Sequence, residues 1–176
     1  MFASLVQGPL LRLFSVGLVV LSLQTTIFSD LRPAGVSLQI MLALSAAAGA
    51  AGGPQKGALA GFVLGLMYDL AVGTPLGSSS IAMGLGGFVA GYVQSITIDP
   101  QWWLAALFTG LGAAVGELAV PVIRAFIGEE HVFDPRFGIV IVVVAAGAMV
   151  LSPLLVPIGR WCLRIKRPEW KAPREP

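Results

Sequence analysis

Long apolar segments separated by short polar ones dominate the chain. Charged residues are absent from residues 13–29, 33–55 and 137–159, which are runs of 17, 23 and 23 residues. A transmembrane helix needs about 20 consecutive, mostly apolar residues to cross the hydrocarbon core of a bilayer. Each of the three runs is therefore long enough for one membrane span.

The middle of the chain contains three further apolar segments. Pro75 and the serines after Gly77 favour a turn, which separates the segment that holds Asp69 from the next one. Asp99 and Pro100 then have the pattern of a helix start, with an N-cap residue before a proline. The sequence thus predicts six spans, at about residues 10–29, 35–53, 57–73, 80–98, 102–127 and 137–159. They form a membrane domain of residues 1–160, and residues 161–176 follow as a tail.

The amino-acid composition agrees with this pattern and excludes several classes of protein. Hydrophobic residues make up 56% of the 176 residues and charged residues 11%, whereas about a quarter of the residues of a soluble domain are charged. The mean hydropathy is +0.87. These values exclude a disordered tail, a coiled coil and a conventional soluble enzyme, and the single cysteine, Cys162, excludes a disulfide scaffold. We expect an all-α integral membrane protein built as a six-transmembrane-helix bundle.

The distribution of basic residues predicts the orientation in the membrane. Six spans place both termini on one side, together with the loop between the second and third spans. That side carries eight basic residues: Arg12, Lys56, Arg160, Arg164, Lys166, Arg167, Lys171 and Arg174. The other side carries three, Arg32, Arg124 and Arg136. Because cytoplasmic loops are enriched in Lys and Arg, both termini are expected in the cytoplasm, and a five-span arrangement fits the charges less well.

The tail of residues 161–176 predicts contact with membrane lipids. It is polybasic, and each Lys or Arg near an anionic lipid surface contributes about 1 kcal/mol of attraction. No basic face alternates with aromatic residues along the chain, so nucleic acid is not expected as a partner.

Small residues recur at every fourth position of the third predicted span. In lipid, where little hydrophobic force drives helices together, such spacing lets two helix backbones approach closely. A comparable glycine face occurs in the fourth span, after the turn. The candidate helix-packing or partner-contact residues are Gly57, Gly61, Gly65, Asp69, Gly73, Gly77, Gly84, Gly87 and Gly91.

Asp69 is an ionisable residue near the outer end of the third span. Such a group is costly at membrane depth unless it finds a partner. One interpretation is a structural anchor held by backbone amides and hydroxyls of the following turn, where Thr74, Ser78, Ser79 and Ser80 are suitable donors. The alternatives are a proton or ion relay and a polar anchor for a partner helix. If Asp69 is a structural anchor, Asn keeps one acceptor oxygen and should retain much of the function.

Glu117 lies deeper, in the fifth span, and Arg124 follows two turns later, so the two can form an intramembrane pair. Nothing else indicates catalysis. The chain has no HExxH, GxSxG or P-loop motif and no nucleophile with a nearby base. The sequence therefore predicts no catalytic site, no metal site and no cofactor, and we do not expect an enzyme.

The segment GALAGFVLGLMYDLAVGTPLGSSSIAMGLGGFVAGYV, residues 57–93, resembles the rod shape-determining MreD family. The shared pattern is a glycine-spaced helix, the motif G-L-x-x-D-L, a short loop with L-G, and a second glycine-rich helix. The matching residues are Gly61, Phe62, Gly65, Leu66, Asp69, Leu70, Gly73, Leu76, Gly77, Gly87 and Gly91. Outside this segment the first, fifth and sixth spans match in hydropathy alone.

The resemblance implies a non-enzymatic component of the bacterial cell-elongation (rod) complex, which supports lateral peptidoglycan synthesis and cell shape. It implies the bacterial cytoplasmic (inner) membrane as location and an MreC-like protein as partner. A RodA-like protein, a class B penicillin-binding protein and MreB are further implied members of the complex. The implied fold is similar to that of the substrate-binding subunits of energy-coupling-factor transporters.

A second hypothesis is a substrate-binding membrane subunit of a small-molecule, vitamin-type transporter. Such a subunit needs convergent polar side chains in a pocket between helices. Polar residues of the spans, such as Gln24, Gln39, Thr109 and Glu117, are scattered and mostly close to span ends. The sequence therefore favours the scaffold over the transporter.

The predicted topology can be tested with alkaline phosphatase, which is active only outside the cytoplasm. Fusion after Glu130, in the outer loop around His131, should give an active enzyme, and fusion after Pro176 should not. Enzyme activity measured in whole cells checks both positions. Activity of the Pro176 fusion would reject an even number of spans with cytoplasmic termini.

Overall fold

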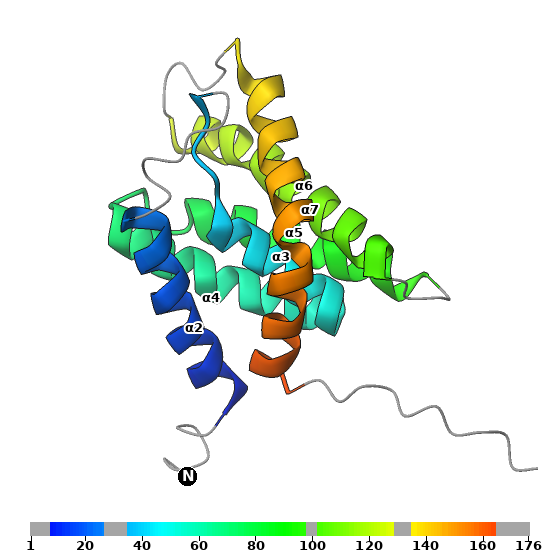
Figure 1. Cartoon of the computed structure of the whole chain (residues 1–176). Coiled ribbons are helices and arrows are strands. Elements are labelled where there is room, and N and C mark those ends of the chain that lie inside the picture. The colour runs from blue at the N-terminus through cyan, green and yellow to red at the C-terminus, as the bar shows by residue number, and fades with distance from the viewer. Residues whose placement is uncertain (1–7, 27–34, 98–101, 129–134, 165–176) are drawn as a thin grey trace, which may run out of the picture.

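Six α-helices make up most of the part of the chain that the structure describes. The computed structural model describes residues 8–26, 35–97, 102–128 and 135–164. The helices are α2 (Pro9–Thr26), α3 (Ile40–Gly52), α4 (Pro54–Val72), α5 (Ser78–Ser95), α6 (Trp102–Ile127) and α7 (Phe137–Cys162) (Figure 1). The described residues contain no strand, so the expected all-α class is confirmed. The outer loop around His131 and the tail beyond Arg164 lie outside the described residues.

The shortest helix, α3, forms the centre of the fold. It packs against each of the other five helices, and every residue from Ile40 to Ala50 is buried. Its 13 residues span only about 20 Å, less than the roughly 30 Å of a bilayer's hydrocarbon core. The predicted span 35–53 is therefore too long. Residues 36–39 are not helical although they are uncharged, because charge alone does not mark a helix start.

Three helices, α2, α6 and α7, are long and apolar enough to cross a membrane. The helices α4 and α5 have 19 and 18 residues but carry more polar groups, including Lys56 and Asp69 in α4 and three serines at the start of α5. The chain is a helical, multi-pass membrane protein with these three candidate spans. The full set of six spans stays a prediction.

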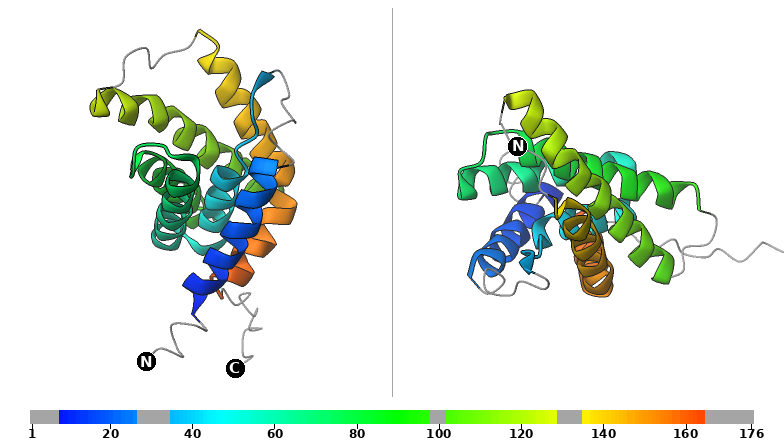
Figure 2. Two further views of the ribbon diagram at one scale, coloured as in Figure 1. Left: turned by 90° about the vertical axis from the view of Figure 1, so that its left-hand side faces the viewer. Right: turned by 90° about the horizontal axis from the view of Figure 1, so that it is seen from above.

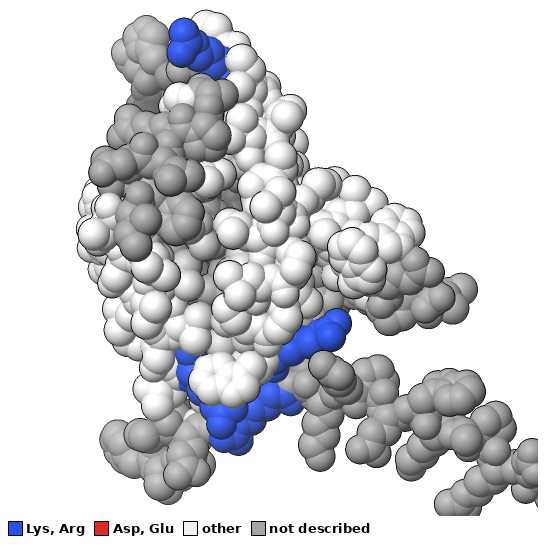
Figure 3. Space-filling model, viewed as in Figure 1, with Lys and Arg blue, Asp and Glu red and all other residues white. Residues whose placement is uncertain are grey.

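The helices run in two main directions. The α2 and α7 helices stand roughly upright and antiparallel, whereas α4 and α5 cross them nearly at right angles (Figures 1 and 2). As a result, the start of α2 and the end of α7 lie at the same end of the molecule (Figure 2). Among the described residues, Lys and Arg side chains gather at this end and a smaller group lies at the opposite end (Figure 3). In this view none of the described residues shows an acidic side chain.

Glycines from α3, α4 and α5 meet at one point. A Cβ atom on Gly57 would lie closer than 3.0 Å to backbone atoms of both Gly49 and Gly87. A Cβ on Gly49 would meet the Gly87 backbone, and a Cβ on Gly87 would meet the Gly57 backbone. Real Cβ atoms essentially never approach that closely. Gly49 was not among the predicted packing residues. We call Gly49, Gly57 and Gly87 the glycine junction.

The α4–α5 contact continues on both sides of the glycine junction. Gly61 faces the carbonyl group of Met83, and Gly65 faces the backbone of Ser79 and Ser80. At the other end, Gly91 lies against Gly53, the single residue that joins α3 to α4. The predicted small-residue face of α4 is thus a continuous helix–helix contact.

A second glycine face of α5 points to α6. A Cβ on Gly86 would meet the carbonyl oxygen of Gly112 at 2.7 Å, and one on Gly112 would meet the carbonyl oxygen of Gly86 at 2.5 Å. One turn later in α6, a Cβ on Gly116 would lie 3.1 Å from the carbonyl oxygen of Ala82. The middle helix α5 is therefore held by close contacts on two sides.

Gly84 differs from the other predicted packing residues. It is half-buried, and a Cβ there would lie 3.4 Å from the carbonyl oxygen of Ala58, an ordinary van der Waals distance. A methyl group therefore fits at Gly84 without displacing the backbone. This makes Gly84 a matched control for Gly87, one turn away on the same helix.

Gly87→Ala should destabilise the fold by about 1–3 kcal/mol, because the added methyl group meets only backbone atoms, which cannot move aside. Gly84→Ala should be neutral or stabilising, since alanine gains up to about 1 kcal/mol of helix propensity over glycine. Denaturant-induced unfolding in detergent micelles, followed by circular dichroism, measures both free energies. Equal stability of the two variants would contradict the glycine junction.

Candidate functional site

The buried carboxylate of Asp69 lies at the end of α4, where the chain turns into α5. The turn begins at Gly73, whose φ of 77° is left-handed and whose N–H donates to the Asp69 carbonyl oxygen. Gly77, with φ of 99°, precedes the first residue of α5. These two predicted residues thus shape the turn and are not helix-packing residues. Asp69 itself is 1% exposed.

Five hydrogen bonds converge on the Asp69 carboxylate. Its Oδ1 atom accepts from the hydroxyl of Thr74 (2.7 Å) and the N–H of Ser79 (3.1 Å). Its Oδ2 atom accepts from the N–H of Gly77 (2.9 Å) and from both the N–H (3.3 Å) and the hydroxyl (3.1 Å) of Ser80. Each oxygen therefore accepts at least one backbone N–H.

The Asp69 carboxylate joins the end of one helix to the start of the next. The first N–H groups of a helix lack intrahelical acceptors and carry a partial positive charge. Asp69 supplies acceptors for two of them, those of Ser79 and Ser80 in α5. Of the expected donors, Ser78 alone points its N–H elsewhere, to the carbonyl oxygen of Pro75. This geometry is that of a structural anchor.

Glu117, the second buried carboxylate, takes its hydrogen bond from a distant part of the chain. The Nε2 atom of Gln39, just before α3, donates to Glu117 Oε2 at 2.7 Å. Arg124, the expected partner, lies close enough for its charge to act on this carboxylate. Glu117 is 6% exposed. The structure therefore gives Glu117 a partner that the sequence did not predict, Gln39, and this hydrogen bond ties α6 to the start of α3. The pair of Glu117 and Arg124 stays a prediction.

A small polar cavity lies over Glu117. Its volume is about 320 Å3, and polar and charged groups of Ser37, Gln39, Glu117 and Arg136 contribute to its wall. The cavity lies between the start of α3, α6 and the start of α7. Of the polar residues that looked scattered in the sequence, Gln39 and Glu117 come together in this cavity, whereas Gln24 and Thr109 do not line it.

The described residues contain no group of three or more His, Cys, Asp or Glu side chains that could hold a metal ion. Cys162 is fully buried at the end of α7.

Comparison with known proteins gives one distant likeness. The chain is 28% identical over 109 residues to the mannitol-specific EIICB component of the PTS system of Staphylococcus saprophyticus. The match covers 56% of this chain and 21% of that protein, so the chain spans about a fifth of the length of this relative. No family model and no solved structure matches the chain. The likeness to a membrane transport component agrees with a multi-pass helical membrane protein.

The hydrogen bonds of Asp69 change the expected effect of Asp69→Asn. An asparagine amide nitrogen would face at least one backbone N–H, so one buried donor would lose its acceptor, at a cost of about 1–3 kcal/mol. We now expect Asp69→Asn to lower the stability, and Asp69→Leu to lower it further. Thr74→Val removes a single donor and should cost about 1 kcal/mol.

Thermal unfolding in detergent, measured beside activity in cells, checks this order. A stable but inactive Asp69→Asn protein would indicate a proton relay instead of an anchor.

Proposed function

We propose that this protein is an MreD-type scaffold of the bacterial cell-elongation complex. In this proposal it is a non-enzymatic, six-span protein of the cytoplasmic membrane with both termini in the cytoplasm. It binds an MreC-like protein and supports lateral peptidoglycan synthesis beside a RodA-like protein, a class B penicillin-binding protein and MreB. Its fold is then expected to be similar to the substrate-binding subunits of energy-coupling-factor transporters.

The observation that supports the proposal is the unit formed by α4, the Asp69 turn and α5. The residues that carry the family resemblance, 57–93, lie within this unit, which extends from Pro54 to Ser95. They serve two purposes within it: glycines close the helix contact, and Asp69 fixes the turn. Such a rigid unit without catalytic groups suits a protein that positions others.

The outward faces of α4 and α5 are apolar. On α4, Leu59, Phe62, Leu66 and Leu70 are exposed at helical spacing. On α5 the rings of Phe88 and Tyr92 stack at 6.1 Å and are also exposed. These apolar faces supply a surface that membrane lipid can cover.

The alternative function is a substrate-binding subunit of a small-molecule transporter. Two observations favour it: the polar cavity over Glu117 and the likeness to a mannitol-specific transport component. The cavity is at the lower end of the usual size of ligand pockets, about 300–1,000 Å3. The scaffold remains the preferred proposal.

Complementation separates the two functions. The chain should restore rod shape to a rod-shaped bacterium depleted of its own MreD-type protein, when expressed with the MreC-like protein from its own genome. That MreC-like protein should also copurify with it. Glu117→Gln should leave both results unchanged, because the amide keeps an acceptor oxygen for Gln39.

Two further results would favour the transporter. One is round cells despite normal amounts of the protein in the membrane. The other is binding of radiolabelled mannitol to the purified protein that Glu117→Gln abolishes. Gly84→Ala is the matched control in both assays, since it changes neither the cavity nor the Asp69 turn.

A further inference from the structure

A groove with apolar walls runs between α2 and α7. Its volume is about 530 Å3, and α3 contributes Ile40 to it. Its walls include Val16, Val20 and Leu23 from α2 and Leu151, Leu155 and Ile158 from α7. From Ser15 to Leu23 the groove follows α2 for eight residues, which is about 12 Å. It can therefore hold an extended apolar chain.

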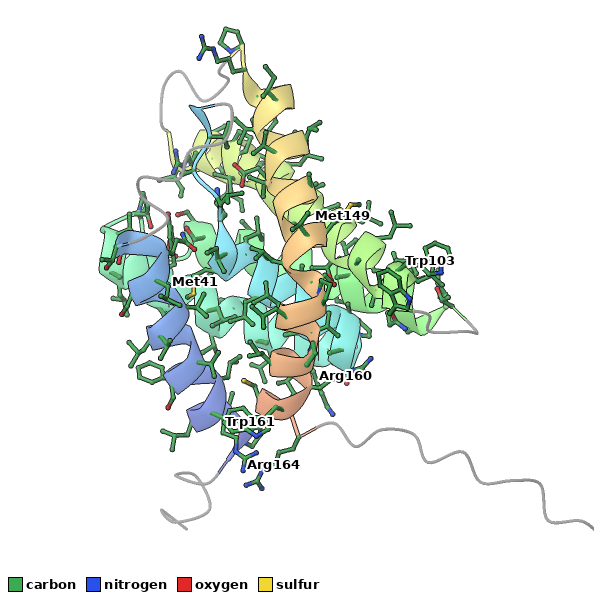
Figure 4. All side chains as sticks on the ribbon, viewed as in Figure 1. Met41, Trp103, Met149, Arg160, Trp161 and Arg164 are labelled. Carbon is green, nitrogen blue, oxygen red and sulfur yellow. The ribbon has the colours of Figure 1, made fainter. Side chains whose placement is uncertain are left out.

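One end of this groove is basic. Ser15 and Trp161 line the end where α2 begins and α7 finishes. Beside it, the guanidinium group of Arg12 lies over the Trp161 ring, 4.9 Å from the ring centre. Arg164 follows three residues after Trp161 and lies at the same end of α7 (Figure 4). This end belongs to the basic region seen in Figure 3.

The charge of Arg12 is not neutralised by a described carboxylate. The acidic side chains within the described ranges are Asp69 and Glu117. Both are buried and accept hydrogen bonds from other residues. The structure thus places an arginine, oriented by an aromatic ring, at the mouth of an apolar groove.

The walls of the groove are unsuited to a partner helix. Close helix contacts in lipid need small residues, but Gly17 of α2 and Gly147 and Gly159 of α7 face inward. Gly17 lies against Leu64 and Met67, Gly147 against Leu38, and Gly159 against Ala48. The groove walls consist mainly of branched aliphatic side chains. A flexible chain can follow such walls, whereas a helix cannot approach them closely.

We propose that the groove between α2 and α7 binds an anionic phospholipid, with one acyl chain between the helices and the phosphate group at Arg12. The acyl chain covers the apolar walls, and the phosphate supplies the negative charge that the described residues lack near Arg12. Trp161 lies between the two regions, as an amphipathic ring does at a membrane interface. This site is independent of the proposed function.

Lipid binding to the purified full-length protein tests the proposal. Native mass spectrometry and melting temperatures are measured with phosphatidylglycerol, with phosphatidylcholine of the same acyl chains, and with glycerol phosphate. Wild-type protein should retain and be stabilised by phosphatidylglycerol over phosphatidylcholine. Glycerol phosphate, which has no acyl chain, should have no effect.

Matched variants separate the acyl chain from the headgroup. Arg12→Gln should weaken phosphatidylglycerol binding about fivefold, whereas Lys56→Gln, which removes an exposed charge outside the groove, should not. Val19→Trp places a large side chain in the groove and should remove the bound lipid. Val150→Trp, at a more exposed position of α7 outside the groove, should retain it.

Three results would overturn the proposal. The first is equal binding of the two phospholipids by the wild-type protein. The second is an equal decrease of phosphatidylglycerol binding in Arg12→Gln and Lys56→Gln, which would indicate that the lipid is attracted to the basic surface as a whole. The third is unchanged lipid binding in a folded Val19→Trp protein, especially if that variant loses its MreC-like partner.

Discussion

The close approach of three helix backbones at Gly49, Gly57 and Gly87 is the constraint on which the rest of this structure depends. Because lipid tails are as apolar as the side chains, helices in a membrane gain little by merely burying leucine. Contact between backbones supplies dispersion attraction that larger residues would prevent. The glycine junction thus determines how α4 and α5 lie on α3, and α3 in turn supports α2, α6 and α7.

The two buried carboxylates complete this arrangement in different ways. Asp69 acts over a short stretch of chain, since all of its donors lie between residues 74 and 80. It therefore fixes a turn. Glu117 accepts from Gln39, 78 residues away in the sequence, and so ties α6 to the segment before α3. The Asp69 carboxylate thus stabilises a local turn, whereas the Glu117 carboxylate lines a cavity that a solute could reach.

The sequence was sufficient for features that depend on local spacing. The apolar segments predicted the positions of all six helices, and α6 begins and ends where expected, at Trp102 and Ile127. The spacing of Gly57, Gly61 and Gly65 predicted a contact face, and the donors after Asp69 could be named because they are close in sequence. The shortness of α3 was missed, because residues 36–39 are uncharged yet not helical.

Other features depend on tertiary contacts that no short pattern contains. Gly49 lies among alanines, so nothing in the sequence distinguishes it as the glycine that meets Gly87. Gly84 belongs to the same series of glycines in α5 as Gly87, but a Cβ atom on Gly84 has more room between the helices. The hydrogen bond from Gln39 to Glu117 could not be inferred either, since neither residue lies near the other along the chain.

The single-residue connection between α3 and α4 has a consequence for the synthesis of this protein. An apolar helix of 13 residues is too short to remain stably across a bilayer by itself, and Gly53 leaves it no separate loop on the far side. The α3 and α4 helices must then leave the translocation machinery together, as one helical hairpin. Their insertion is complete only when α5 arrives to cover the small residues that both expose. The short length of α3 therefore determines the order in which these helices insert into the membrane.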